Sequence, residues 1–492
     1  MAKDAALTVG RAFLSAASRV PSRTAIRFEN REISYAELAA DSGRVAGALL
    51  REIGCAAGDR VGVWLPNRPE FVVATLGIAR AGLVVVPIPL SATLREVAHY
   101  IADSGLRVLI TDGGREAAGV TLTTVEALLG AAGPPLGDMA DEAAPFFIGY
   151  TSGTTGRPKG AVVGHRARTL LGLVYGQEYG CYTPGEMHLI TTPMYHGAGL
   201  SRALAPLLSG AAIELHETFD PELVMRAFAN GAITATYMVP TMFAAIFELP
   251  QSALGGGGGQ LRTVLSNAAA LPEHLKLQIL DQWPGIRLFE IYGSTEAGTV
   301  ASLRPEDQLR KQRCVGLPLP LTDVRLVGQD GYEVGSDEVG KLYSRSPFQF
   351  MGYHQNSLAT AEAMLDGFLT SGDLARRDEE GYIYIVGRDS DVIVTGGVNV
   401  YPREVEEYLA ELAGVREAAV VGVPDPHWGE AVHAFVVAQP GVTSPTEAEL
   451  REHCRKGLSP AKIPKSFLFR ANLPRTASGK VIKRELLRSE TG

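Results

Sequence analysis

The chain has 492 residues, of which 46% are hydrophobic and 20% are charged, and its formal net charge is −8. This is an ordinary globular composition with enough apolar residues for large cores, and the length predicts roughly three folding units. The acidic balance argues against a nucleic-acid-binding protein, because such proteins are usually basic.

The four cysteines lie far apart, and no metal-binding or disulfide spacing connects them. The first residues contain no apolar stretch typical of a signal peptide. Apolar runs such as 83–89 are far too short to span a bilayer. These features predict a cytoplasmic protein without a transmembrane segment.

Short β-branched runs alternate with helical patterns through the first three-quarters of the chain. The helical patterns at 221–230 and 272–283 each open with proline, which is favoured in the first turn of a helix. This alternation predicts an α/β fold with mostly parallel sheets covered by helices. The runs that predict buried strands are 60–65, 83–88, 146–150, 188–192, 211–216, 234–239 and 287–292.

The pattern changes near residue 322, and again at 388–391. Between these points, short alternating runs at 323–327, 340–345 and 382–386 predict antiparallel strands of a small β subdomain. Residues 392–492 predict a small α+β domain, a plausible unit by size. Its predicted elements are a helix from Pro402, strands at 418–423 and 432–438, and a helix at 446–456.

A segment rich in glycine and hydroxyl groups follows the strand that ends at Tyr150. Glycines allow backbone N–H groups to turn toward an anion, hydroxyl groups donate further hydrogen bonds, and Lys159 supplies positive charge. A polar turn without a ligand is the plain alternative, which this many donors disfavours. No Ser or Thr follows the lysine, so this is not the Walker pattern. The segment is therefore predicted to bind phosphates through Thr151, Ser152, Gly153, Thr154, Thr155 and Lys159.

This segment resembles the signature of the ANL superfamily of adenylating enzymes, and more specifically its acyl-CoA synthetase branch. Further matching segments follow in the family's order at 291–296, 370–373, 387–388, 394–402 and 473–480. The resemblance covers nearly the whole chain. It implies an N-terminal adenylate-forming domain at 1–387 with its β subdomain from about 322, a hinge at 388–391 and a mobile C-terminal domain at 392–492.

The resemblance implies that ATP and Mg²⁺ are used to convert an apolar carboxylic acid into an acyl-adenylate. Pyrophosphate leaves, and the acyl group then passes to coenzyme A. Negative charge gathers in the transition state of such a transfer, so cations and oriented donors carry most of the catalysis. By resemblance, Lys480 bridges the acyl carboxylate and the α-phosphate, and Thr295 donates to the α-phosphate. Glu296 and Thr155 are the expected Mg²⁺ contacts, because oxygen atoms suit this ion.

Further nucleotide contacts follow from the same resemblance. Tyr292 is expected to stack on the adenine, and Asp373 and Arg388 are expected to hydrogen-bond the ribose. The other residues expected around the nucleotide are Ala268, Glu290, Ile291, Gly293, Ser294 and Ile385.

The acid pocket is expected beside residues 193–199 and 266–270. His196 follows a strand end, where ligands bind in open α/β sheets, and is expected to act as a gate between the acid and the phosphates. The other expected lining residues are Gly199, Tyr237, Met238, Asn267, Ala268 and Gly293. Relatives often have Gly-Gly or Gly-Ser where Asn267 and Ala268 stand, so this wall is expected to be narrower or more polar.

Arg202 leaves three interpretations open. It pairs with a second acidic group of the substrate, forms a salt bridge within the protein, or lies at an exposed helix position.

The coenzyme A contacts are expected at Gly396, Gly397, Trp428 and Lys465, because glycines permit close approach of a ligand to the backbone. Domain packing is the alternative role for Trp428. Ser390 stands where relatives often have Asp or Lys at the hinge, and Asp391 is expected to share that role.

The alternatives to an acid:CoA ligase are an acid:AMP ligase that loads a separate carrier protein and a non-catalytic nucleotide-binding protein. Monomer and homodimer remain open.

Overall fold

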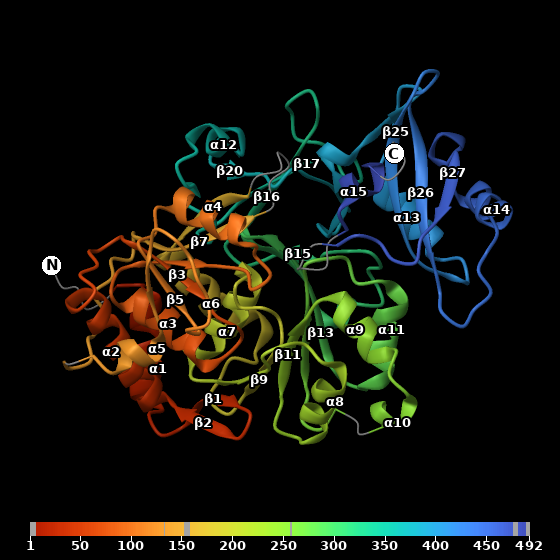
Figure 1. Ribbon diagram of the computed structural model, residues 1–492. Helices are drawn as coiled ribbons and strands as arrows, with labels where there is room; N and C mark the ends of the chain where they lie inside the picture. Colours follow the sequence, from red (N-terminus) through yellow and green to blue (C-terminus); the bar gives the residue numbers. More distant parts are fainter. Residues whose placement is uncertain (1–5, 132, 152–157, 256–257, 476–480, 489–492) are drawn as a thin grey trace. The chain divides into compact units, whose positions relative to one another are not determined.

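The computed structural model describes residues 6–131, 133–151, 158–255, 258–475 and 481–488 (Figure 1). It divides into two compact units. Unit 1 comprises Met1–Asp323 and Ser344–Leu369, and unit 2 comprises Val324–Tyr343 and Thr370–Gly492. The expected hinge at 388–391 lies within unit 2 in this division, so a domain boundary at that point stays a prediction.

The larger sheet of unit 1 has the strand order β15-β14-β13-β12-β11-β9-β10-β1-β2. The strands from β13 through β1 run parallel, and β2, β14 and β15 join antiparallel. Four of the predicted buried strands are therefore confirmed within this sheet. The bounds are β1 (Thr24–Phe28), β2 (Arg31–Ser34), β9 (Met187–Ile190), β10 (Ala212–Leu215), β11 (Ala235–Met238), β12 (Thr263–Ser266), β13 (Arg287–Ser294), β14 (Gly298–Leu303) and β15 (Leu317–Pro318).

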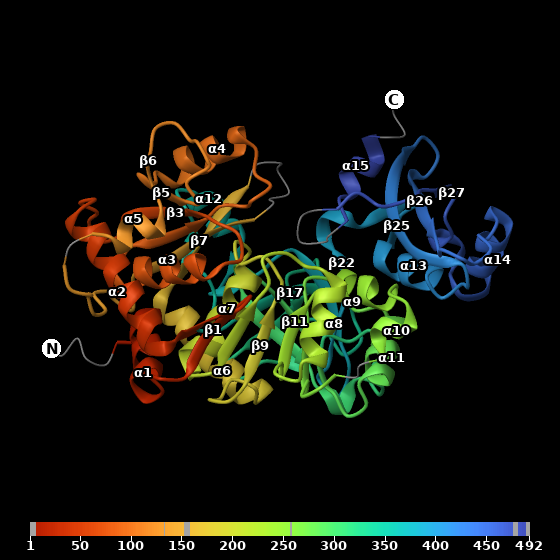
Figure 2. The ribbon, with the colours of Figure 1, turned by 60° about the horizontal axis from the view of Figure 1, so that its bottom comes forward.

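Helices cover both faces of this sheet. Val264 and Leu288 face a core formed with α8 (Pro221–Ala229), α9 (Pro240–Phe247), α10 (Gln251–Leu254) and α11 (Glu273–Gln282). The next residue on each strand, Leu265 and Phe289, faces the opposite core with α6 (His165–Tyr179) and α7 (Gly197–Ser209). Successive side chains of a strand point to opposite faces, which explains the switch. Figure 2 shows α8 to α11, in green, together on one side of these strands.

The second sheet of unit 1 has the order β18-β8-β7-β4-β3-β5-β6. On one face, Val97 and Tyr100 of α4 (Leu94–Ser104) pack against strand residues such as Val84. β7 and β8 pair antiparallel with Thr151 opposite Lys159, so the expected phosphate segment connects two paired strands. The bounds are β3 (Arg60–Trp64), β4 (Val84–Pro87), β5 (Val108–Thr111), β6 (Thr121–Thr123), β7 (Pro145–Thr151), β8 (Lys159–Gly164) and β18 (Gly352–Tyr353).

Local signals explain where several helices of unit 1 begin. Ser34 and Glu37 form a capping box at the start of α2, and Thr93 and Glu96 form another at α4. Pro69 starts α3 with the fixed φ that a first helical turn accepts. The remaining elements of unit 1 are α1 (Val9–Arg19), α2 (Tyr35–Arg51), α3 (Pro69–Arg80), α5 (Val125–Leu129), η2 (Pro305–Asp307), α12 (Ser357–Glu362), β19 (Met364–Leu365) and β20 (Phe368–Leu369).

Unit 2 contains two groups of mainly antiparallel strands, with one parallel pairing, that of β27 (Ser466–Phe469) with β26 (Gly429–Ala438). The first group contains β16 (Asp323–Val327), β17 (Gly340–Arg345), β21 (Asp373–Arg377) and β22 (Ile383–Arg388). The second is a sheet of order β24-β23-β26-β25, in which β27 also pairs with β26. Val405 of α13 and Leu450 of α14 pack on this sheet against Val420 and Val436. The bounds are β23 (Ile393–Thr395), β24 (Val398–Val400), β25 (Val415–Asp425), β26 (Gly429–Ala438), β27 (Ser466–Phe469), α13 (Pro402–Leu409), α14 (Glu447–Gly457), α15 (Lys483–Arg488), η3 (Asp389–Asp391) and η4 (Pro460–Lys462).

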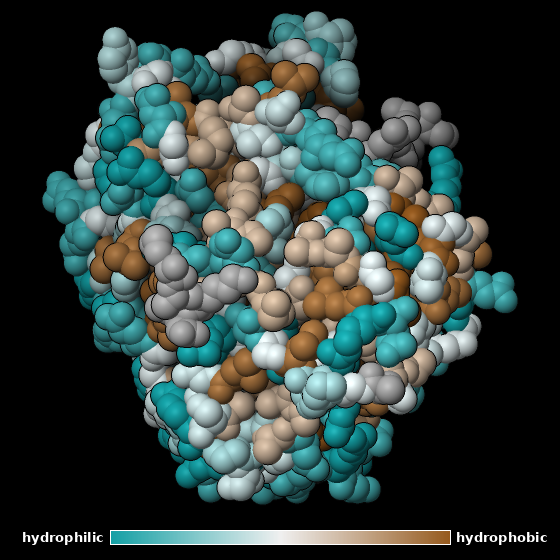
Figure 3. Space-filling view, turned by 90° about the vertical axis from the view of Figure 1, so that its left-hand side faces the viewer, coloured by the Kyte–Doolittle hydropathy of each residue, from teal (hydrophilic) through white to brown (hydrophobic). Residues whose placement is uncertain are grey.

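These elements confirm the predicted α/β class, with mostly parallel sheets in the larger part and α+β structure near the C-terminus. Within the part of the chain that the structure describes, no helix combines the length and apolarity that crossing a bilayer requires. On the face shown in Figure 3, hydrophobic residues in brown lie interspersed with hydrophilic residues in teal.

The buried His188 of β9 makes folding sensitive to pH. Its Nε2 lies 2.6 Å from the carbonyl oxygen of Cys181, and its ring stacks on Tyr182 with centroids 4.7 Å apart. Burial lowers the pKa of His188 to about 4. A histidine in the unfolded chain has a pKa near 6.5. The contribution of neutral, buried His188 to the free energy of unfolding is therefore complete above about pH 6.5, and it is lost as the pH falls toward 4.

Between pH 6.5 and 4, we therefore expect the free energy of unfolding to fall by about 3 kcal/mol less in His188→Gln than in wild type. A glutamine amide still donates to the Cys181 carbonyl but does not titrate. Urea unfolding at a series of pH values measures the effect, with the exposed His427→Gln as a control. An unchanged slope in His188→Gln would show that this histidine is not kept neutral by burial.

Candidate active site

The carboxyl ends of β9, β11, β12 and β13 meet at one edge of the larger sheet. Ser266 of β12 lies opposite both Met238 of β11 and Glu290 of β13 in parallel register. Ligands of open parallel sheets bind outside such an edge. Residues at or beyond this edge therefore gather in one region. Of the predicted residues, His196, Asn267 and Ala268 follow strand ends, and Tyr292 lies within β13, two residues past the partner of Ser266.

A strained turn follows β12 at this edge. Ala268 has a φ of 74°, and its N–H lies 2.5 Å from Oδ1 of Asn267. A non-glycine residue in the left-handed region costs on the order of 1 kcal/mol or more, and such strain concentrates at functional sites. Asn267 and Ala268, which are predicted to adjoin both the acid and the nucleotide, thus form a turn that contacts with the surrounding protein must hold in place.

Glu296 lies at the centre of a hydrogen-bonded cluster in unit 1. It occupies the tight turn between β13 and β14, in which a Cβ added at Gly293 would come within 2.1 Å of the Gly298 carbonyl oxygen. Oε1 of Glu296 accepts hydrogen bonds from Thr151 Oγ1 at 3.1 Å and from Tyr353 OH at 3.0 Å. The structure therefore brings the start of the phosphate segment and the predicted metal-binding carboxylate into direct contact.

Thr295, beside Glu296, lies between two further segments of the site. A Cβ added at Gly149 of β7 would lie 3.0 Å from its methyl group, and one added at Gly197 would lie 3.3 Å from its hydroxyl oxygen. Gly197 follows His196, which is the N-cap residue of α7. Thr295 is thus next to both the phosphate hairpin and the expected gate of the acid pocket.

Tyr353 is a site residue that the sequence patterns did not reveal. It belongs to the short strand β18, which pairs with β8. Its ring lies 5.4 Å from Nζ of Lys159, and its hydroxyl donates to Glu296. Burial and the neighbouring Glu296 carboxylate raise the pKa of Tyr353, so it stays a protonated donor at neutral pH. Its contact with the motif residue Glu296 spans 57 positions of sequence, so no local pattern indicates it.

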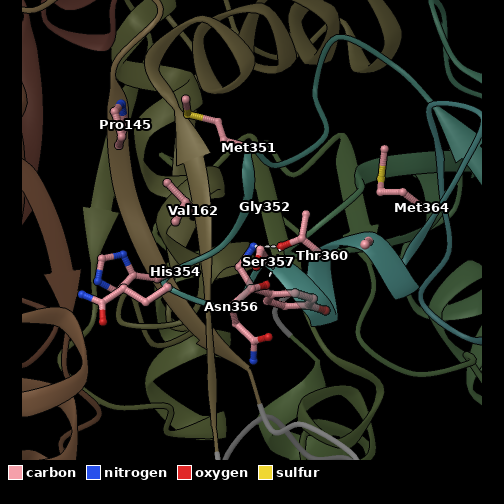
Figure 4. Close-up of a pocket in the computed structure, with 12 residues that line it drawn as sticks. Pro145, Val162, Met351, Gly352, His354, Asn356, Ser357, Thr360 and Met364 are labelled. Atoms are coloured by element: carbon pink, nitrogen blue, oxygen red, sulfur yellow. Dashed lines mark hydrogen bonds between the residues drawn. The ribbon is translucent and has the colours of Figure 1, made fainter.

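A surface hollow of about 790 Å³ is lined in part by this strand, with Tyr353 among the lining residues (Figure 4). Val162, Met351 and Met364 contribute apolar parts of its wall. The backbone N–H of Tyr353 donates to Thr360 Oγ1 at 2.9 Å, and Thr360 Oγ1 donates to the carbonyl of Asn356 at 2.8 Å. These bonds hold the backbone from which Tyr353 reaches Glu296.

The cluster around Glu296 has the donor chemistry that Mg²⁺ requires. Mg²⁺ beside a nucleotide is commonly held by one or two carboxylates together with phosphate oxygens and water. Glu296 supplies a carboxylate, and the Thr151 hydroxyl adjoins it. Among the described residues, no group of three or more His, Cys, Asp or Glu side chains is arranged to hold a metal ion.

Five predicted phosphate and catalytic residues fall outside the described residues. They are Ser152, Gly153, Thr154, Thr155 and Lys480.

The predicted acid-pocket glycines have close backbone neighbours. A Cβ added at Gly199 would lie 2.2 Å from the carbonyl oxygen of Pro193, so close packing alone requires glycine there. At position 293, glycine is likewise required by close packing, because an added Cβ would lie 2.1 Å from the carbonyl oxygen of Gly298. Tyr237 is buried among the side chains between the sheet, α6 and α7, and Met238 faces the opposite core. Their contacts with an acid stay predictions.

Arg202 on α7 is neither exposed nor part of a salt bridge with a described residue. It is 3% exposed, and its guanidinium lies 3.9 Å from the centroid of the Tyr175 ring. Two of the three interpretations left open by the sequence are therefore excluded for the described part of the chain.

In unit 2, the two predicted ribose contacts lie side by side. Asp373 of β21 is opposite Arg388 of β22, and Nε of Arg388 is 3.3 Å from Oδ1 of Asp373. Ile385 lies on the same strand as Arg388, opposite Ala375. The β21–β22 pairing thus explains how two separate sequence motifs contribute to one small surface.

The structure also brings together three of the four predicted coenzyme A contacts. They are Gly396, Trp428 and Lys465, and we call them the Trp428 patch. Trp428 is 42% exposed, and Lys465 Nζ lies 5.0 Å from the centroid of its ring. Gly396 N–H donates to the Trp428 carbonyl at 2.8 Å, and a Cβ added at Gly396 would lie 2.9 Å from the ring. Gly397 follows with a φ of 79°, which favours glycine.

The predicted hinge residues lie in the short helix η3. Ser390 is exposed, and its hydroxyl donates to Asp391 Oδ1 at 3.0 Å. Next to them, Asp389 accepts from Lys341 Nζ at 3.0 Å. Their role as a hinge stays a prediction.

Comparison with known proteins gives consistent matches over the whole chain. Residues 13–354 match the family described as AMP-binding enzyme, and residues 404–480 match the AMP-binding enzyme C-terminal domain. A feruloyl-CoA synthase from an Amycolatopsis species is 36% identical over 95% of this chain and 96% of that protein. An indoleacetate–CoA ligase from Aromatoleum aromaticum is 34% identical over 94% of each chain. The structure of ATP-bound MatB from Rhodopseudomonas palustris is 30% identical, with a TM-score of 0.90 over 98% of this chain and 99% of that one.

Loss of the hydrogen bond from Tyr353 to Glu296 is predicted to weaken activity with ATP and to change its dependence on Mg²⁺. Removing a hydrogen bond to a charged group costs about 1.5–3 kcal/mol. We expect Tyr353→Phe to lower kcat/KM for ATP by roughly 10- to 100-fold and to raise the Mg²⁺ concentration needed for half-maximal activity. Pyrophosphate release across a Mg²⁺ series measures both.

The control for this substitution is Tyr332→Phe, because Tyr332 is 75% exposed. Wild-type Mg²⁺ dependence in Tyr353→Phe would show that the phenol does not support the metal-binding carboxylate.

Proposed function

The chain belongs to the family of AMP-binding enzymes, and we propose that the acid it activates has an aryl ring. It is an AMP-forming acid–thiol ligase, which uses ATP and Mg²⁺ to make an acyl-adenylate and then transfers the acyl group to coenzyme A. The curated relatives named above are both CoA ligases, and loading of a separate carrier protein is not favoured.

The aryl substrate is supported by relatives and by the side chains behind the sheet edge. The two relatives carry the names of aromatic acids, feruloyl and indoleacetate. In this chain, Tyr175, Tyr179 and Tyr237 pack together between the sheet and helices α6 and α7. Aromatic rings favour other rings in offset or edge-on contact, so these tyrosines suit the flat ring of an aryl acid, and the guanidinium of Arg202 lies against the same three rings.

The first half-reaction needs charge compensation around the phosphates. A carboxylate oxygen attacks the α-phosphorus of ATP, the bond from that phosphorus to the bridging oxygen breaks, and pyrophosphate leaves. In our proposal Thr151 and Lys159 orient the β- and γ-phosphates, with Ser152, Gly153, Thr154 and Thr155 beside them. Glu296 holds the metal ion, which neutralises charge on the phosphate oxygens when bound. Thr295 donates to the α-phosphate, and Lys480 bridges it to the acyl carboxylate.

The acid and the nucleoside then lie on two sides of the sheet edge. His196 separates the acid from the phosphates, and Asn267 and Ala268 form the wall between acid and adenine. Tyr292 stacks on the adenine, together with Glu290, Ile291, Gly293 and Ser294 of the same strand. Asp373 accepts hydrogen bonds from the ribose hydroxyls, with Arg388 and Ile385 beside it. The adjacency of Asp373 and Arg388 supports this assignment.

The second half-reaction forms a thioester bond from the thiolate sulfur of coenzyme A to the acyl carbon, and AMP leaves. We assign the Trp428 patch and Gly397 to coenzyme A, because an exposed ring beside a lysine suits a nucleotide base and a phosphate. Ser390 and Asp391 are the proposed pivot between the two half-reactions. The four cysteines are free, which is consistent with the cytoplasmic location that we also propose.

The proposed acid class is tested with a panel of benzoic, cinnamic, arylacetic, short-chain and long-chain fatty acids. We expect pyrophosphate release to be fastest with an aryl acid, and coenzyme A to be consumed in equal amount. A fatty acid that outperforms every aryl acid by tenfold or more would overturn the aryl assignment while leaving the ligase activity intact.

Lys480→Ala separates the two half-reactions. We expect adenylation to fall by at least 100-fold, because a preorganised charge at the transition state is lost. Thioester formation from synthetic acyl-adenylate is expected to stay within a few-fold of wild type. Lys456→Ala, at an exposed position of α14, is the control. Equal loss of both half-reactions would contradict the assigned role of Lys480.

A further inference from the structure

Two arginines are buried in unit 1 between the larger sheet and its helices. Arg168 on α6 is 7% exposed, and Arg202 on α7 is 3% exposed. Tyr175 lies about two turns after Arg168 on α6, and its ring centroid is 3.9 Å from the Arg202 guanidinium. The charge of Arg202 also acts on Arg168 and lowers its pKa, so the two buried cations are near enough to repel each other.

Neither arginine has a carboxylate partner among the described residues. Arg202 donates to Tyr182 OH at 3.3 Å and faces the rings of Tyr175, Tyr179 and Tyr237. Arg168 lies 4.9 Å from the centroid of the Phe147 ring, and its buried Nε has no hydrogen-bond partner. The hydroxyl of Tyr237 is also buried without a partner. Polar groups in this region are thus left unsatisfied.

This arrangement is costly for a folded protein on its own. A buried cation loses hydration, and a second cation nearby adds repulsion. Burial, and to a smaller extent the nearby Arg202, lower the pKa of Arg168 to about 10, so Arg168 stays charged at neutral pH. Cation–π contacts with tyrosine offset part of the cost at Arg202. Arg168 has a single ring contact and an unpaired N–H, so less of its cost is offset.

The pair lies directly behind the proposed reaction centre. Phe147, which contacts Arg168, is also 3.9 Å from a Cβ built at Gly197, and that Cβ is 3.3 Å from the Thr295 hydroxyl. Gly197 and Arg202 are both on α7, separated by roughly 7.5 Å along the helix axis. The start of α7, which adjoins Thr295, and Arg202 are thus about one and a half helical turns apart on one helix.

We propose that Arg168 and Arg202 bind a second anionic group, carried by the far end of the acid that this enzyme activates. The proposal rests on the ligase function assigned above and narrows its substrates to acids with two acidic groups. The substrate anion supplies the counter-charge that the described part of the chain lacks, and the Tyr237 hydroxyl adds a hydrogen bond to it. Charge-assisted bonds of this kind select strongly against neutral analogues, because an analogue leaves both cations buried and unpaired.

The test compares acids that differ only in the second charge. Succinate through azelate, and terephthalate and 4-carboxycinnamate, are each paired with their monomethyl esters, and pyrophosphate release gives kcat/KM. We expect wild type to prefer the diacid of one pair over its ester by on the order of 100-fold or more. In Arg202→Met and in Arg168→Met this ratio is expected to fall by at least tenfold.

Arg287→Met is the matched control, because Arg287 also lies against a ring of this core, Phe289, but is exposed. Its diacid-to-ester ratio is expected to equal that of wild type. A wild-type ratio near one for every pair would overturn the proposal while leaving the ligase function standing. Failure to release pyrophosphate with any acid of either panel would instead overturn the proposed function.

Thermal unfolding separates substrate binding from a structural role for the arginines. We expect Arg202→Met to unfold at or above the wild-type temperature without ligand, because it removes an uncompensated buried charge. We also expect the preferred diacid, but not its ester, to raise the unfolding temperature of wild type. A variant that unfolds at lower temperature and loses diacid and ester activity by one common factor would show a structural cation, and would contradict the proposal.

Discussion

The site depends on the position of one carboxylate, that of Glu296. Thr151 and Tyr353 donate hydrogen bonds to the same oxygen of this side chain, and they belong to β7 and β18, the two strands that flank β8 in the second sheet of unit 1. Because Glu296 itself belongs to the β13–β14 turn of the larger sheet, these two bonds connect both sheets at the point where phosphates and metal are expected. A carboxylate held in this way has one oxygen engaged and keeps its other oxygen for the ion.

The turn that carries Glu296 requires close approach of backbone atoms, and glycines make this approach feasible. Gly293 adjoins the Gly298 carbonyl, Gly149 adjoins Thr295, and Gly197 adjoins Thr295 from the other side. A side chain at any of these positions would push the phosphate hairpin, the metal turn and the start of α7 apart.

The sequence predicted the α/β class and seven of the strands in the two sheets of unit 1, because buried parallel strands have strong apolar runs. It also indicated the motifs, which are contiguous, whereas the roles of their residues stay predictions. It did not reveal Tyr353, whose role depends on pairing between β8 and β18, strands that are far apart in the chain. It assigned Gly199 to substrate space, whereas the close Pro193 carbonyl is sufficient reason for glycine. For Arg202 the sequence left three interpretations, since burial and the absence of a described carboxylate are properties of tertiary structure.

The central claim is that this enzyme activates its acid by transferring AMP to it. Separation of the nucleotide and acyl products by chromatography and mass spectrometry, first without coenzyme A and then after its addition, tests this claim most directly. The account predicts acyl-adenylate and pyrophosphate in the first stage, followed by acyl-CoA and AMP in the second. Formation of ADP and phosphate together with the acyl-CoA would contradict it, because the acid would then have attacked the terminal phosphate rather than the α-phosphate.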